Sequence, residues 1–139
     1  MKRKVIFMSL ILVISFSMVS VANAYIKASE YISDVYANAI KYSDGRVQVS
    51  FDIKATDTMD VVGVKTIIIQ EKLKGETSWT SVATLSSDSY SNMLTYNKRQ
   101  HASNVTYYGA VSGRSYRAKV YFYAENGGYD TKEYITPGV

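Results

Sequence analysis

The sequence contains no cysteine, one histidine, one proline and one tryptophan among its 139 residues. Without cysteine the chain can form no disulfide, no thiolate zinc site and no thiol nucleophile. Because His101 is its only imidazole, a metal site built from several histidines is excluded as well. The sequence therefore predicts no cofactor and no metal, and a domain whose stability depends on its hydrophobic core.

Groups suited to catalysis are also scarce. His101 lies in a polar stretch, residues 98–103, that we interpret as a loop between strands, and no Gly-x-Ser-x-Gly motif is present. The acidic residues are scattered along the chain, whereas glycoside hydrolysis needs two carboxylates across a cleft. We therefore expect no catalytic residues and no enzyme. A small hydrolase using Asp and Glu is the least favoured alternative.

The first 24 residues have the three parts of a secretory signal. A basic segment at residues 2–4 precedes an apolar run, and Ala22-Asn23-Ala24 forms a cleavage site of the A-x-A type. Serines interrupt the run, which is shorter than the roughly 20 apolar residues of a transmembrane helix. We predict cleavage near Ala24 and a secreted domain, residues 25–139, without membrane contact; a retained anchor is the alternative.

Removal of this leader would change the charge of the protein. The whole chain has 16 basic and 12 acidic residues, a net charge of +4, and Lys2, Arg3 and Lys4 supply three of the basic ones. The rest of the chain then has a net charge of only +1. Such a domain has no long-range positive field, and we expect it to bind no nucleic acid.

Alternation of apolar and polar residues predicts strands rather than helices. The clearest patterns are residues 47–55 and residues 116–124. In the second, one face carries Tyr116, Ala118, Val120, Phe122 and Ala124, and the other carries Arg117, Lys119, Tyr121 and Tyr123. Residues 64–73 are β-branched and nearly continuous, and we expect Ile67 and Ile69 to face inward and Ile68 outward.

Weaker strand patterns complete the predicted fold. They cover residues 31–41 (with an amphipathic helix as the alternative), 78–85, a short piece near 93–96 within the polar stretch 86–104, 105–111 and 129–136. Turns such as Asp44-Gly45 separate several of them. Seven or eight short strands at this spacing predict a single all-β domain, an antiparallel immunoglobulin-like β-sandwich.

Part of the chain resembles fibronectin type III modules. Residues 111–128 have an apolar residue, a glycine corner, Tyr116, alternating apolar positions and a final glycine turn, as in the E–F–G stretch of those modules. Residues 67–84, with Trp79, resemble their C–C′ hairpin. The resemblance implies that Tyr116 is a tyrosine corner, whose hydroxyl bonds to the backbone of the preceding turn. The chain departs from the pattern at Ser112 and Phe51, where the modules have proline and tryptophan.

Most of residues 43–136 also resemble a family of small secreted proteins of Gram-positive bacteria. The matching stretches are residues 50–55, the link from Thr58 to Val64, and residues 121–124. This family is uncharacterised, so the resemblance implies a fold and an extracellular location but no activity.

Tyrosine is the one residue type in surplus, with 13 copies. If Val120 and Phe122 face the core, Tyr121 and Tyr123 face outward. Tyrosine favours interfaces and also stacks on sugar rings. The alternative is that tyrosine serves here only as a strand former. The candidate binding surface comprises Tyr121, Tyr123, Arg117, Lys119, Ile68, Gln70 and Tyr134, and the expected structural residues are Tyr116, Trp79, Phe51, Phe122 and Val120.

We therefore expect a secreted, non-enzymatic binding domain that presents this surface to a protein or cell-surface partner. A carbohydrate- or cell-wall-binding domain that uses the same tyrosines is the alternative. A dimer formed through an exposed last strand is left open by the sequence.

Overall fold

The computed structural model describes residues 30–139, which form six antiparallel strands and one turn of 3-10 helix. The elements are β1 (Ile32–Lys41), β2 (Val47–Lys72), β3 (Thr80–Ser86), the 3-10 turn (Ser91–Met93), β4 (Leu94–Tyr107), β5 (Ser115–Glu125) and β6 (Tyr129–Ile135). The predicted secretory signal, residues 1–24, lies outside this range. Within residues 30–139, no helix has the length and apolar character needed to cross a membrane.

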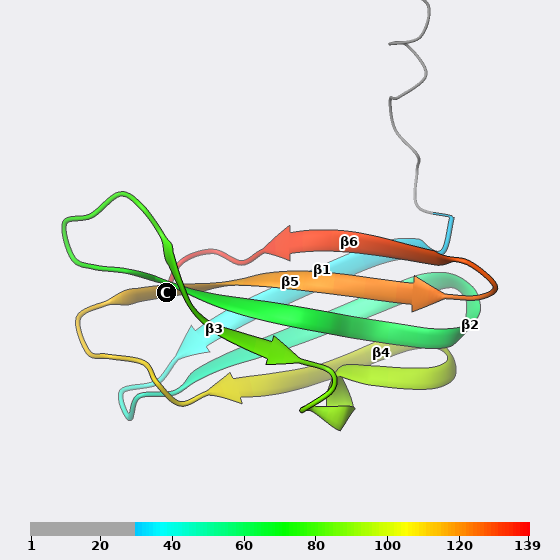
Figure 1. Cartoon of the computed structure of the whole chain (residues 1–139), viewed down its shortest axis with the longest axis horizontal. Coiled ribbons are helices and arrows are strands. Elements are labelled where there is room, and N and C mark those ends of the chain that lie inside the picture. The colour runs from blue at the N-terminus through cyan, green and yellow to red at the C-terminus, as the bar shows by residue number, and fades with distance from the viewer. Residues whose placement is uncertain (1–29) are drawn as a thin grey trace, which may run out of the picture.

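Strand β2 organises the sheet because it is 26 residues long and every other strand except β6 pairs with it. Its first half pairs with β1 on one side and with β4 on the other. Its second half pairs with β5 and β3, and β6 pairs with β5. The sheet curls into a half-barrel (Figure 1). The predicted all-β antiparallel class is confirmed.

The curl has a local cause in the middle of β2. Lys54 pairs with Gln100 and Met59 with Lys98, so four residues of β2 lie opposite the single residue Arg99 of β4. Such a bulge bends a strand and increases its twist. As a result, the sheet curls so that its two ends approach one another across the core, as the contact between Phe51 and Phe122 shows.

Apolar side chains fill the inner side of the curled sheet. Phe51 from the first half of β2 and Phe122 from β5 meet edge to face, with ring centroids 6.5 Å apart. The five apolar positions predicted for residues 116–124 are all fully buried, as are Ile67 and Ile69, whereas Ile68 is partly exposed. The predicted phases of both strands are therefore confirmed.

The number of strands differs from the prediction of seven or eight. Residues 47–55 and 64–73 are parts of one strand, because the polar link between them continues as the bulged segment of β2. The pieces expected near 93–96 and 105–111 likewise merge into β4, and residues 108–111 lie beyond its end. Most side chains of β4 between residues 96 and 104 are exposed, so this strand lacks the alternation by which strands are recognised.

Candidate functional site

The predicted binding surface lies on the solvent side of β5 and the second half of β2. Because side chains alternate along β5, burial of the Tyr116–Ala124 set turns the intervening residues outward. Pairing of the two strands places Ile68 opposite Lys119 and Gln70 opposite Arg117. We call this surface the outer face; it comprises Arg117, Lys119, Tyr121, Tyr123, Glu125 and Ile68 together with Lys65, Trp79, Tyr129, Glu133 and Ile135. Gln70, the remaining candidate on this side of the sheet, is only 7% exposed and so offers little of its side chain to a partner.

Tyr134 does not belong to the outer face, and its inclusion in the candidate surface was wrong. It pairs with the buried Val120, and directly paired residues of an antiparallel sheet point to the same side. Its ring therefore packs against the core and contacts Tyr36 of β1, with centroids 6.1 Å apart. A one-residue change of phase on β6 decides the face of every side chain in the strand.

One end of the outer face is built from two stacked tyrosines. The rings of Tyr123 and Tyr129 lie 5.8 Å apart at an interplanar angle of 24°, and the Lys65 ammonium lies 4.4 Å from the centroid of Tyr123. The Tyr123 hydroxyl donates a 2.6 Å hydrogen bond to Glu125. This bond, assisted by burial, raises the pKa of Tyr123 to about 12. Tyr123 is therefore enclosed by neighbours rather than freely displayed.

Tyr129 is the ring that this end of the surface presents to solvent. It is 67% exposed, and the β5–β6 hairpin places it diagonally across from Tyr123. Neither Tyr129 nor Lys65 stood out in the sequence as a candidate. The glycine turn at residues 127–128 carried a usable signal for Tyr129, since a tight hairpin there brings it beside residue 125.

Trp79 forms the opposite end of the outer face. Its ring lies between the Lys72 ammonium, 4.9 Å from the centroid, and the Arg117 guanidinium, 4.6 Å away. A Cβ atom added to Gly138 would be 3.1 Å from this ring, so the indole covers the C-terminal segment. Arg117 also donates a 2.7 Å hydrogen bond to Gln70. The half-buried Trp79 thus holds elements together, as expected for a structural residue.

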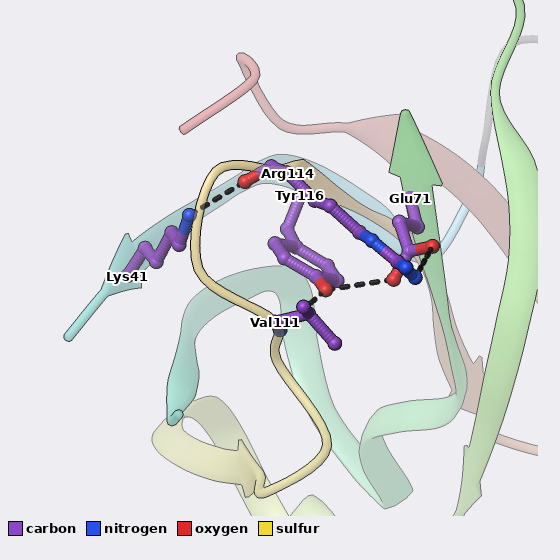
Figure 2. A network of polar contacts seen from close by, with 5 residues as sticks. All are labelled: Lys41, Glu71, Val111, Arg114 and Tyr116. Atoms are coloured by element: carbon purple, nitrogen blue, oxygen red, sulfur yellow. Dashed lines mark hydrogen bonds and ion pairs between the residues drawn. The ribbon is translucent and has the colours of Figure 1, made fainter. Parts of the chain in front are cut away.

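Figure 2 shows the polar network around Tyr116, at the corner that leads into β5. The Tyr116 hydroxyl accepts a 2.7 Å hydrogen bond from the Val111 amide, which is the backbone contact expected for a tyrosine corner. It donates a 2.7 Å bond to Glu71, whose other oxygen accepts 2.9 Å from Arg114. The Arg114 carbonyl in turn accepts a bond from the Lys41 ammonium.

This network changes the acidity of two groups. The hydrogen bond from Tyr116 lowers the pKa of Glu71, and the Arg114 guanidinium adds to the effect against the opposing influence of burial. Burial, followed by the bond to Glu71, raises the pKa of Tyr116. Glu71 and Tyr116 are both held inside the fold, so we assign them a structural role.

His101 lies in β4, so its expected place in a loop was wrong. Its Nε2 atom is 2.7 Å from the Asn92 carbonyl oxygen, and its ring packs 5.9 Å from Phe51. A shallow pocket of about 270 Å³ nearby is lined by Ser33, Lys54, Ala55, Arg99 and Gln100. Among residues 30–139, no three His, Asp or Glu side chains gather in a way that could hold a metal ion.

No protein-family model matches the sequence, and no curated protein matches it. Among solved structures, the sporulation control protein Spo0M of Bacillus subtilis is similar to this chain with a TM-score of 0.44 and 10% sequence identity. The match covers 78% of this chain and 50% of that protein, so the chain spans about half its length.

Proposed function

We propose that this protein is a secreted, non-enzymatic binding domain and that the outer face of β2, β5 and β6 contacts a protein or cell-surface partner. The observation that carries the proposal is the stacked pair of Tyr123 and Tyr129, which fixes a ring that remains 67% exposed. Exposed aromatic rings with fixed orientations lose little conformational entropy when a partner binds.

The composition of the surface supports this proposal. Two aromatic ends, at Trp79 and Tyr129, flank a middle that contains Lys119, Tyr121 and Ile135. Tyrosine, tryptophan and arginine are the residues that most often contribute strongly to binding interfaces. The non-enzymatic assignment is supported by the surroundings of His101, the one histidine in the sequence. Its ring contacts a backbone carbonyl oxygen and packs against Phe51.

We further propose that the curled sheet is related to immunoglobulin-like and fibronectin type III-like sandwiches. The hydrogen bond from the Val111 amide to the Tyr116 hydroxyl supports this relation, since a tyrosine corner of this kind is typical of such folds. The predicted signal at residues 1–24 supports an extracellular location.

Cosedimentation of the purified protein with washed cells of the producing bacterium tests the binding proposal. We expect the protein to bind, and the double variant Tyr121→Ser/Tyr129→Ser to bind at least about tenfold more weakly, because loss of two contact residues commonly costs this much. The matched control is Tyr36→Ser/Tyr108→Ser, which removes tyrosines that are 58% and 75% exposed and lie outside the outer face.

Control and outer-face variants should melt within a few degrees of the wild-type protein, since all four side chains lie at the surface. Equal binding by the two double variants, or no binding of the wild-type protein to cells, would contradict the proposal.

A further inference from the structure

We propose that the ligand of the outer face is an acidic polysaccharide, which lies along β5 with a sugar ring on Tyr129 and its carboxylates near Lys65 and Lys119. This inference rests on the proposed function and names the ligand class of the same surface.

The aromatic contribution comes from Tyr129. One side of its ring stacks on Tyr123, while 67% of the residue is accessible to solvent. Tyr123 is itself held by its hydrogen bond to Glu125 and by the Lys65 ammonium. A flat ring that is fixed in this way and open on one side can stack against the C–H face of a sugar ring. Because the ring is already held in place, it loses little conformational entropy on binding.

The charge of the surface favours an anion. The ion pairs among residues 30–139 are Asp44–Arg46 and Glu71–Arg114, so neither Lys65 nor Lys119 has a carboxylate partner there. Of the two acidic groups on the outer face, Glu125 accepts the hydrogen bond from Tyr123. Glu133 lies opposite Tyr121 on β6 and would repel an anion. The ligand should therefore run from Tyr129, at the start of β6, across β5 toward β2, and away from Glu133.

The backbone arrangement favours a polysaccharide over an extended peptide. β5 is paired on both sides, with β2 and with β6, so it has no free edge to which a peptide could add as a strand. Lys119 and Tyr123 are four residues apart, or about 13 Å along the strand, which suits a linear chain. Two pockets within residues 30–139 are lined by residues outside the outer face.

Affinity electrophoresis of the purified protein with three polymers tests the ligand class. Polygalacturonate supplies sugar rings and carboxylates, its methyl ester supplies the rings alone, and poly-glutamate supplies the carboxylates alone. We expect polygalacturonate to retard the protein, with at least a tenfold weaker effect from each of the other polymers. Equal retardation by poly-glutamate, or none by polygalacturonate, would overturn the inference.

Variants assign the binding to these residues. We expect Tyr129→Ser to weaken binding to polygalacturonate at least tenfold and Tyr129→Phe, which keeps the ring, to restore most of it. Lys65→Gln/Lys119→Gln should weaken binding at least tenfold and reduce its salt dependence. The matched control Lys54→Gln/Lys98→Gln removes two exposed lysines elsewhere and should bind normally. Equal effects of the two lysine pairs would overturn the inference.

The two proposals can fail separately. If the outer-face tyrosine variants lose cell binding while polygalacturonate does not bind, the ligand class is wrong and the proposed function stands. If outer-face and control variants bind cells equally, both proposals are wrong.

Discussion

Tyr116 joins three parts of the molecule through one hydroxyl group. It is completely buried, accepts a hydrogen bond from the Val111 amide in the loop before β5, and donates one to Glu71 of β2. A buried polar group that is fully paired stabilises a specific arrangement, whereas an unpaired one is costly. The loop between β4 and β5 therefore depends on this residue for its position.

Replacement of Tyr116 by phenylalanine should lower the free energy of unfolding by about 1–3 kcal/mol. The variant keeps the ring but leaves the Val111 amide and one Glu71 oxygen without their partner. Urea denaturation at pH 7 measures the change. Tyr108→Phe, at a residue that is 75% exposed, is the control and should change stability by less than about 0.5 kcal/mol. Equal effects of the two substitutions would contradict the role of the hydroxyl.

Glu71 should make the stability depend on pH in the acid range. Its pKa is lowered from the usual 4.5, chiefly by the hydrogen bond from Tyr116. The stabilisation is therefore present above pH 4.5 and is lost as the pH falls through the lower pKa of the folded state. We expect Glu71→Gln to lower the free energy of unfolding at pH 7 by about 1–3 kcal/mol.

Urea denaturation at pH 7 and again at about pH 3 checks this expectation. The difference between the wild-type protein and Glu71→Gln should shrink at the lower pH. A difference that stays the same at both pH values would show that the charge of Glu71 is not the source of its effect.

The sequence predicted part of these residue roles. Tyr116 was recognisable because it begins an alternating strand just after a glycine corner. Its partner Glu71 lies 45 positions earlier in the chain, and only the pairing of β2 with β5 brings the two together. Tyr129 was missed because one residue of a short hairpin strand carries no periodicity of its own.

Among the strands, β2 determines how the sheet curls. Its bulge at residues 55–58 is followed by Gly63, which has a φ of +152° and lies against the segment that starts β4. A Cβ atom at residue 63 would be 2.2 Å from the Met93 carbonyl oxygen, closer than such atoms can approach. Both backbone conformation and space therefore require glycine here.

Gly63→Ala should therefore lower the free energy of unfolding by about 3 kcal/mol or more, because backbone strain and a steric clash add together. Gly75→Ala is the matched control: its φ is +83°, but nothing lies within 4 Å of the added Cβ atom. That variant should lose only about 1–2 kcal/mol. Thermal denaturation compares the two, and equal losses would contradict the close approach at Gly63.

Strands with one buried face and one solvent-exposed face were predictable from the sequence, because apolar and polar residues alternate along them. β5 follows this rule along its whole length, so its phase was predicted correctly and each of its ends to within one residue. β4 does not, since it lies at the edge of the sheet and exposes most of its side chains. The continuity of β2 was also hidden, because the polar residues of its bulge have the composition of a turn.

At the scale of the whole molecule, one curled sheet encloses the core on its inner side and exposes the outer face, which we propose as the binding surface. Phe122 is fully buried and contacts Phe51 of the first half of β2, whereas Tyr121, its neighbour, points to solvent. One face of β5 therefore contributes to the stability of the fold, and the other carries aromatic rings on the surface.

A pair of substitutions separates these two faces. Phe122→Ala should lower the free energy of unfolding by about 3–5 kcal/mol, because it leaves a cavity in the core. Tyr121→Ala should cost about 1 kcal/mol or less, since its side chain is partly exposed. Chemical denaturation of both variants checks the difference, and similar losses would contradict the described phase of β5.

NMR chemical-shift mapping with short galacturonate oligomers tests most directly whether the outer face is the contact surface. In the isotopically labelled protein, we expect the perturbed signals to belong to Tyr129, Tyr121, Lys119 and Lys65 and to their neighbours on β2 and β5. Perturbations centred on the pocket at Arg99 and Lys54 would contradict the outer face as the contact surface, and no perturbation at millimolar oligomer would contradict the proposed ligand class.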